Sequence, residues 1–125
     1  MIVTDERVAR FVGERTGTII FPPFTCIGID RDGEVIGGAV FNCFEGFDIQ
    51  ATVVGRGFTK GCLADVGHYV FDQLGCERIS AKTEQAVVVR LTERLGGQIE
   101  GLLRNHFGPG RDAFVVGILK DEWKF

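Results

Sequence analysis

The stretch RGFTKG at residues 56–61 contains the residue types that bind phosphate groups. It combines two cations, Arg56 and Lys60, with the hydroxyl group of Thr59 and with glycines that let backbone N–H groups approach a ligand closely. Apolar residues at helical spacing follow it, and a helix N-terminus offers unpaired N–H donors and a positive dipole end. The stretch departs from a Walker P-loop because Lys60 is followed by Gly61 rather than by Ser or Thr. By residue type alone, it is either a phosphate site or a solvated turn.

The four cysteines do not form a metal-binding pattern, because the chain has no CxxC pair and no nearby pair of histidines. We expect all four to be small buried hydrophobic residues of a reducing compartment. They are Cys26, Cys43, Cys62 and Cys76. The two histidines, His68 and His106, are predicted to be structural or surface residues rather than catalytic ones.

Composition predicts one globular domain over residues 1–125. Hydrophobic residues make up 45% of the chain and charged residues 25%, which is typical of a folded domain. The net charge of -3, without a block of like charges, does not favour binding to nucleic acid or to an anionic membrane. No apolar run approaches the roughly 20 residues that cross a bilayer, and the N-terminus does not have the pattern of a signal peptide. We therefore expect a cytoplasmic protein.

Hydrophobic periodicity predicts the elements that position these residues. Apolar residues every three to four positions indicate helices, and alternation of apolar and polar residues indicates strands. The Asp32-Gly33 pair indicates a tight hairpin, because type I′ turns need positive φ angles. The expected elements are a helix from Thr4 to Gly17, a turn at 21–24, strands at 24–30, 34–44 and 47–54, a helix at 62–74 ended by Gly75, a strand at 76–83, a helix at 84–95 ended by Gly96, and strands at 98–107 and 112–120. This order predicts a mixed α/β (α+β) fold, with helices flanking one largely antiparallel sheet.

Four blocks in the second half of the chain form an ordered set of motifs. They are YVFDQLGCERI at 69–79, ERLGG at 93–97, EGLLR at 100–104 and DAFVVGILKDEW at 112–123. In the same order, they resemble motifs of the GNAT superfamily, the acyl-coenzyme A-dependent N-acyltransferases, and most of all the branch of N-terminal acetyltransferases of ribosomal proteins. The resemblance covers roughly residues 47–123 and implies a GNAT-like domain that is shortened at its N-terminus.

The resemblance also implies a site for acetyl-coenzyme A, the cosubstrate of the superfamily. In the family, the strand before the long helix diverges from its neighbour, and the pantetheine arm lies against its backbone. The matching backbone positions are Thr52, Val53 and Val54. The pyrophosphate lies at the N-terminus of the following helix, where the matching residues are Arg56, Thr59, Lys60 and Gly61. Gln85, near the start of the last helix, would bond an amide of the arm.

Acetyl transfer to an amine needs a group that takes up the proton of the nucleophile. Asp48 is the first candidate for this base and Glu45 is the second, while Glu84 would act from the opposite side of the cleft. Each of the three could instead be a solvated surface carboxylate. The resemblance does not decide between these two roles.

Two functions follow from the resemblance. The first is an acetyl-coenzyme A-dependent N-acetyltransferase that transfers an acetyl group directly to a primary amine of a small molecule or peptide. The alternative is a catalytically degenerate GNAT-fold binding or structural module, such as a virus could encode, and it is favoured by Val88 and Thr92, which replace a serine and a tyrosine of relatives. A homodimer, formed through the terminal strands or through Trp123 and Phe125, is a further expectation.

Overall fold

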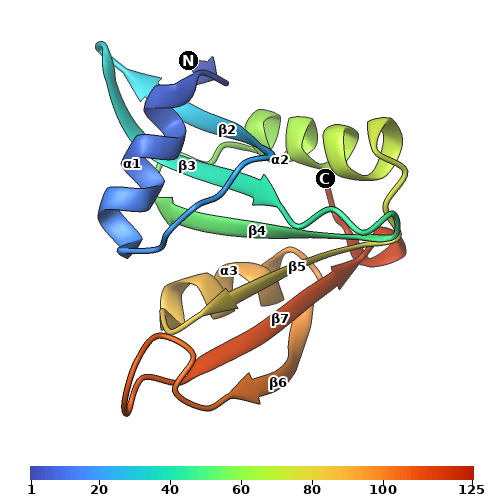
Figure 1. Ribbon diagram of the computed structural model, residues 1–125. Helices are drawn as coiled ribbons and strands as arrows, with labels where there is room; N and C mark the ends of the chain where they lie inside the picture. The colour runs from blue at the N-terminus through green and yellow to red at the C-terminus, as the bar shows by residue number, and fades with distance from the viewer.

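The computed structural model describes residues 1–125 and contains a seven-stranded sheet with helices on both faces (Figure 1). The strands follow the order β1-β2-β3-β4-β5-β7-β6, and every neighbouring pair is antiparallel except β4 and β5. The strands are β1 (Ile2–Val3), β2 (Phe24–Arg31), β3 (Glu34–Asn42), β4 (Asp48–Gly55), β5 (Arg78–Thr83), β6 (Gln98–Leu103) and β7 (Ala113–Leu119). The helices are α1 (Glu6–Thr16), α2 (Lys60–Gly67), which continues as the π-helix η1 (His68–Gln73), α3 (Ala86–Arg94) and the short 3-10 helix η2 (Lys120–Glu122). The expected mixed fold is confirmed.

The first helix begins one residue later than the sequence predicts. Asp5 rather than Thr4 is its N-cap, because the backbone N–H of Arg7 donates to the Asp5 carboxylate at 2.9 Å. The helix ends as expected at Gly17, whose φ of 69° is favourable for glycine. Strand β1, which pairs with β2, is not predicted because two residues are too few to show alternation.

The β2–β3 hairpin confirms the expected Asp-Gly turn. Asp32 and Gly33 have φ angles of 54° and 86°, both positive as a type I′ turn requires. Farther along the hairpin, Gly28 and Gly38 lie opposite each other, and a Cβ atom on either would lie 2.6 or 2.7 Å from a methyl group of Val8. The lack of side chains at this pair lets α1 pack directly on the hairpin.

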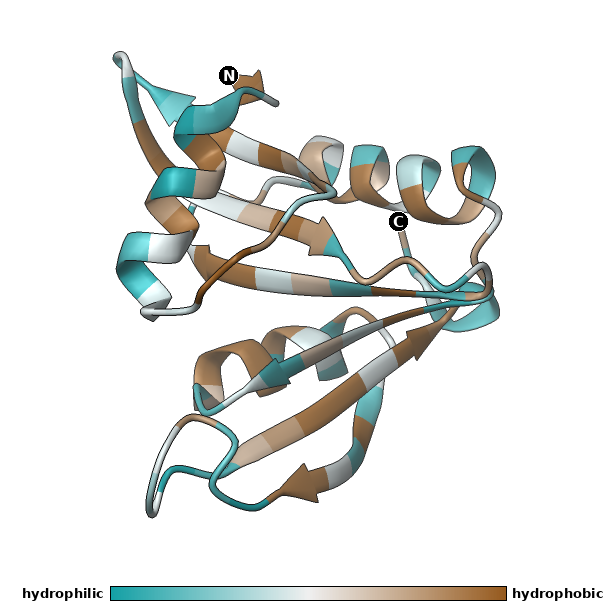
Figure 2. Cartoon of the chain, in the orientation of Figure 1, coloured by the Kyte–Doolittle hydropathy of each residue, from teal (hydrophilic) through white to brown (hydrophobic).

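The sheet separates two hydrophobic clusters. On one face, Val8 and Val12 of α1 pack against Val40 of β3. The next residue of β3, Phe41, points to the opposite face, where a larger cluster joins the sheet to α2, η1 and the end of α3. Figure 2 shows alternating hydrophobic and hydrophilic stretches along the helices, whereas β7 is hydrophobic along most of its length. The two clusters hold helices on both faces of the sheet.

The only parallel contact in the sheet is short. Strands β4 and β5 pair over three residues, from Asp48 opposite Arg78 to Gln50 opposite Ser80. Beyond this point β4 continues along β3, and β5 continues along β7, so the two strands diverge (Figure 1). The divergence divides the sheet into two antiparallel halves that are joined at one end.

The second helix starts earlier than residue 62 because Thr59 is its N-cap, and it is packed closely against the C-terminus of the chain. The indole of Trp123 lies on the backbone at Gly67, where an added Cβ atom would overlap the indole nitrogen. The same ring contacts Phe71 edge to face, with ring centroids 5.7 Å apart. The chain end is therefore fixed to this helix by a contact that only glycine allows.

We predict that Gly67→Ala lowers the free energy of unfolding by about 1 to 3 kcal/mol, because the methyl group displaces the indole of Trp123. The matched control is Gly61→Ala in the same helix, where an added Cβ atom has no neighbour closer than 3.8 Å. Urea denaturation followed by circular dichroism measures both. Equal stability of Gly67→Ala and the wild type would contradict the observed packing.

Candidate active site

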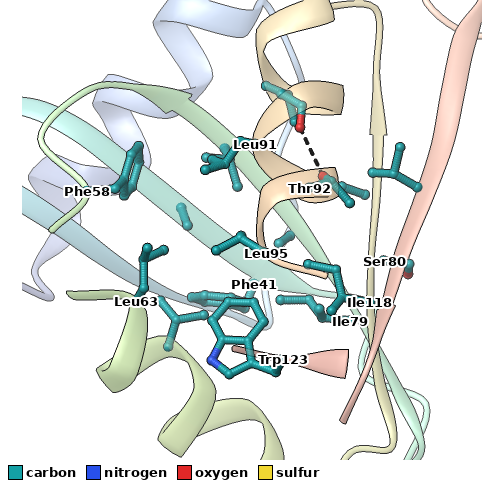
Figure 3. Close-up of a pocket in the computed structure, with 17 residues that line it drawn as sticks. Phe41, Phe58, Leu63, Ile79, Ser80, Leu91, Thr92, Leu95, Ile118 and Trp123 are labelled. Carbon is teal, nitrogen blue, oxygen red and sulfur yellow. Dashed lines mark hydrogen bonds between the residues drawn. The ribbon is translucent and has the colours of Figure 1, made fainter. Parts of the chain in front are cut away.

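The divergence of β4 and β5 opens a narrow cleft between the sheet and helices α2 and α3. The cleft holds about 70 Å³, and only Ser80 and Thr92 among its lining residues are polar. Figure 3 shows Phe58 and Leu63 on one side, Leu91 and Leu95 facing them, and Trp123 at the base of the cleft. The lining residues are Ala39, Phe41, Ala51, Val53, Phe58, Leu63, Val66, Ile79, Ser80, Ala81, Val88, Leu91, Thr92, Leu95, Val116, Ile118 and Trp123.

The backbone of β4 presents free polar groups to this cleft at alternate residues. The carbonyl of Ile36 accepts from the N–H of Arg56 at 3.0 Å, so every second residue before Arg56 also bonds to β3. Thr52 and Val54 therefore direct their backbone groups toward β3, which does not agree with the acceptor role expected for them. Val53 directs its N–H and C=O groups to the side where β5 has departed. Of the three expected positions, Val53 alone can bond a ligand in the cleft through its backbone.

The predicted phosphate loop, residues 56–61, lies at one edge of the cleft, since Phe58 within it and Leu63 after it line the cleft wall. Thr59 caps α2, because its hydroxyl oxygen accepts from the N–H of Cys62 at 3.2 Å. The N–H groups of Lys60 and Gly61, in the first turn of the helix, have no intrahelical partner.

The surroundings of these N–H groups are open to a ligand. A Cβ atom added at Gly61 would have no neighbour closer than 3.8 Å, so its backbone is accessible. Arg56 and Lys60 are exposed and form no ion pair. The structure thus brings two free N–H donors and two free cations together at this edge.

Gln85 lies on the other side of the divergence. It precedes α3, and its carboxamide forms no hydrogen bond within the chain. It lines a second cavity of about 190 Å³ together with Thr52, Val53 and Lys82. The neighbouring Glu84 is paired with Arg111, and this hydrogen bond lowers the pKa of the Glu84 carboxyl group. Gln85 can therefore contact a ligand that also contacts Val53, while Glu84 is held in an ion pair.

Asp48 is connected to the cleft by one hydroxyl group. The Ser80 hydroxyl donates to the Asp48 carboxylate, with distances of 2.9 and 3.1 Å to its two oxygens. Nε of Arg78 donates to the same carboxylate at 3.3 Å, and Arg78 also pairs with Glu100. Ser80 is buried, lines the cleft and belongs to the last pair before the strands diverge. Asp48 itself does not line the cleft, so the Ser80 hydroxyl is its connection to it.

Glu45, the second candidate base, is placed differently. It lies in the exposed turn between β3 and β4 and forms no ion pair. It lines neither the cleft nor the cavity beside Gln85. The backbone N–H of Glu45 donates to the carbonyl of Asp48 at 2.9 Å, so the two residues are neighbours, but the Glu45 side chain bonds to neither Asp48 nor Ser80.

Three of the four cysteines are buried, as expected, and burial raises the pKa of the thiols of Cys26, Cys62 and Cys76. Cys43 is exposed, and the expectation of burial is wrong for this residue. It follows the last residue of β3 with a φ of 54°, so it lies outside the ladder that buries the strand. No group of three His, Cys, Asp or Glu side chains could hold a metal ion. No helix is long and apolar enough to span a membrane.

No protein-family model matches the sequence, and no curated protein sequence matches it either. The fold is nevertheless similar to solved structures. A mutant of the spermidine N-acetyltransferase SpeG from Vibrio cholerae is 15% identical, with 99% of this chain and 97% of that chain covered and a TM-score of 0.75. The same enzyme in complex with manganese ions is 17% identical, with 97% and 92% covered and a TM-score of 0.73. A candidate acetyltransferase from T. thermophilus is 24% identical, with 82% and 62% covered and a TM-score of 0.66.

The chain has the GNAT fold. The four sequence blocks occupy connected parts of it: residues 69–79 run from η1 into β5, and residues 93–97 end α3. Residues 100–104 and 112–123 contribute to the β6–β7 hairpin and η2. Ser80 and Lys82 were not identified from the sequence, because only the strand register places them at the divergence. The alternation of β5 shows that these two side chains share a face, but it does not show what lies opposite.

We predict that a single thiol, that of Cys43, reacts rapidly with Ellman's reagent in the folded protein at pH 8. The other three thiols are buried and have raised pKa values, so both access and ionisation disfavour their reaction. Cys43→Ser should abolish the fast phase, while denaturation of the wild type should expose all four thiols. Two or more fast thiols in the folded wild type would contradict the assigned burial.

Proposed function

We propose that this GNAT-fold protein is an N-acetyltransferase that moves the acetyl group of acetyl-coenzyme A directly onto a primary amine. The observation that carries the proposal is the divergence of β4 and β5 beside the free N-terminus of α2. One edge of the cleft offers N–H donors and cations for phosphate, and its wall offers the free backbone of Val53 for an amide. Phosphates and amides are the polar groups of coenzyme A, and the two kinds of donor lie along one path.

The chain's own groups suit each part of this cosubstrate. The N–H groups of Lys60 and Gly61, with the side chains of Arg56 and Lys60, would hold the pyrophosphate at the positive end of the α2 dipole. The backbone of Val53 and the carboxamide of Gln85 would bond the pantetheine arm from its two sides. The thioester would then lie near Ala51, which lines both the cleft and the cavity beside Gln85.

Asp48 and Ser80 would take up the proton of the amine. The amine nitrogen attacks the thioester carbonyl carbon, a C–N bond forms, the C–S bond breaks, and coenzyme A leaves as a thiolate. The proton released by the nitrogen passes to Oγ of Ser80, while the hydroxyl proton of Ser80 passes to Asp48 along the existing hydrogen bond. In this scheme Ser80 touches the reacting amine and Asp48 is the final acceptor.

A second candidate function is a GNAT-fold binding or structural module that does not transfer an acetyl group. It is favoured by Thr92, whose buried hydroxyl donates to the carbonyl of Val88 at 2.9 Å and so is not free to protonate a leaving thiolate. Isothermal titration with acetyl-coenzyme A, with desulfo-coenzyme A and ATP as comparisons, separates the two functions. Micromolar binding that is selective for the acyl cosubstrate supports transfer, and absence of binding up to millimolar concentration supports the module.

Four expectations from the sequence stay predictions. These are the ribosomal-protein branch, the single-domain organisation, the cytoplasmic location and the homodimer. A homodimer is supported by β6, a sheet edge in which all six residues are exposed, and by the exposed apolar side chains of Leu102 and Phe114, which lie opposite each other on β6 and β7.

We predict that Lys60→Glu weakens the binding of acetyl-coenzyme A about tenfold or more, because a charge-assisted hydrogen bond to phosphate contributes roughly 1.5 to 3 kcal/mol. Lys124→Glu makes the same change of charge at another exposed lysine and should leave the affinity unaltered. Titration calorimetry measures the affinity, and circular dichroism checks that both variants are folded. Equal affinities of the two variants would remove the phosphate role of Lys60.

We predict that Asp48→Asn and Ser80→Ala each lower kcat at neutral pH by at least about tenfold, since general base catalysis typically contributes 10² to 10⁴ in rate. Both should leave the affinity for acetyl-coenzyme A nearly intact, because neither side chain lies at the phosphate end of the cleft. Steady-state acetylation assays with any accepted amine provide the measurement. Glu45→Gln is the comparison, and a loss of rate in that variant alone would transfer the base role to Glu45.

A further inference from the structure

A third and larger cavity, of about 780 Å³, adjoins the point where β4 and β5 diverge. The α1–β2 loop and the turn after β3 form parts of its wall, and η1 and the β6–β7 loop form others. In Figure 1 the α1–β2 loop crosses in front of β3 and β4. The volume lies within the range of about 300 to 1,000 Å³ that is typical of small-molecule sites.

This cavity reaches the same reaction point as the proposed acetyl-coenzyme A site. Ala51 lines the narrow cleft, the cavity beside Gln85 and this third cavity. Thr52 and Lys82 line both this cavity and the one beside Gln85. A molecule in the third cavity can therefore place an amine beside the thioester while its body stays outside the cosubstrate site.

The wall of the cavity is aromatic. Six rings line it, and they are Phe21, Phe24, Phe41, Phe44, Tyr69 and Phe107. The inner rings of Phe41 and Tyr69 are fixed edge to face, with centroids 5.5 Å apart, and the Tyr69 hydroxyl is hydrogen-bonded to Thr25 at 2.6 Å. Phe21 and Phe44 at the rim are 72% and 53% exposed, so a bound ligand can still bury a large part of both rings. These surfaces favour an apolar and flat ligand.

The charges around the cavity do not favour a polycation. No carboxylate lines it, and the one ammonium group in its wall, that of Lys82, forms no ion pair. The acidic groups on the neighbouring strands and at the start of α3 are bound to arginine: Asp48 and Glu100 to Arg78, and Glu84 to Arg111. Glu45, which follows Phe44, forms no ion pair but does not line the cavity. A second ammonium group on a ligand would therefore find a like charge and no free partner in the cavity.

We infer that the acceptor of this protein is a primary monoamine with an aromatic body, which reacts as the neutral amine, rather than a polyamine. The inference rests on the proposed acetyltransferase function. The six rings take up the aromatic body, and the single amine points to Ala51, next to the Gln50–Ser80 pair that ends the contact between β4 and β5.

The test compares 2-phenylethylamine with spermidine on the full chain. With acetyl-coenzyme A, kcat/KM for 2-phenylethylamine should exceed that for spermidine at least tenfold. Without acetyl-coenzyme A, saturation-transfer NMR should detect 2-phenylethylamine but not spermidine. Equal or higher kcat/KM for spermidine, or no NMR signal from 2-phenylethylamine, overturns the inference.

Two phenylalanines of the same turn supply a matched pair of variants. Phe44 lines the cavity, whereas Phe47 is 72% exposed and does not line it. Phe44→Ala should raise the dissociation constant for 2-phenylethylamine about tenfold, which corresponds to one lost ring contact. Phe47→Ala should leave it unchanged. Equal weakening in both variants, or in neither, overturns the placement of the ligand.

Different results refute the acetyltransferase function and the aromatic acceptor. Absence of acetyl-coenzyme A binding refutes the acetyltransferase function, even where the NMR signal of 2-phenylethylamine and its loss in Phe44→Ala uphold the aromatic amine site. Binding and turnover of acetyl-coenzyme A with a preference for spermidine uphold the function and refute the aromatic acceptor.

Discussion

The architecture depends on a single short parallel contact between two antiparallel half-sheets. Strands β4 and β5 meet over three residue pairs, and each then follows its other neighbour. A polar network crosses this junction: Asp48 of β4 bonds to Ser80 and Arg78 of β5, and Arg78 pairs with Glu100 of β6. The network lies over Gly117 of β7, where a Cβ atom would come within 2.5 Å of the Glu100 carboxylate. The strands are thus held together at one end and are free to separate at the other.

This junction explains why polar backbone groups can remain unpaired next to a hydrophobic core. Buried N–H and C=O groups normally find partners in the sheet, and leaving them without partners is unfavourable. Here the departure of β5 leaves the backbone groups of Val53 without a partner strand on the side away from β3, while apolar side chains from α2 and α3 cover the rest of the cleft. A ligand that adds amides along β4 replaces the missing strand. The same divergence supplies the space and the unsatisfied groups that favour binding.

Local patterns predicted the elements well, because each leaves a signal within a few residues. The Asp32-Gly33 turn and the helix end at Gly75 follow from backbone preferences, and their positive φ angles agree. Relations between distant segments were not predictable in the same way. Successive residues such as Thr52 and Val53 direct their backbone groups to opposite edges of β4. Only the register with β3 shows which of the two directs its backbone groups toward the cleft.

Among the site residues, too, those that depend on local sequence could be predicted, and those that depend on distant segments could not. Asp48 could be named from its place before a strand, whereas its partner Ser80 depends on the parallel register of two strands that are far apart in sequence. The exposure of Cys43 was not predicted, because cysteine is usually a buried residue. The backbone leaves the β3–β4 ladder at this position, and the residue is therefore exposed. Side chains that converge on the aromatic cavity from several strands and loops leave no common sequence pattern.

The glycine pair beneath α1 has a consequence for the width of the aromatic cavity. Gly28 and Gly38 let Val8 rest directly on the hairpin, which fixes the height of α1 above the sheet. The loop that leaves α1 forms one wall of the cavity, from Thr18 to Phe24. Any side chain at the pair would lift the helix and carry this wall outward. Under the proposed function, these two glycines therefore help to set the size of the acceptor although neither lines the cavity, and the range of acceptors could change during evolution without any substitution in the cavity itself.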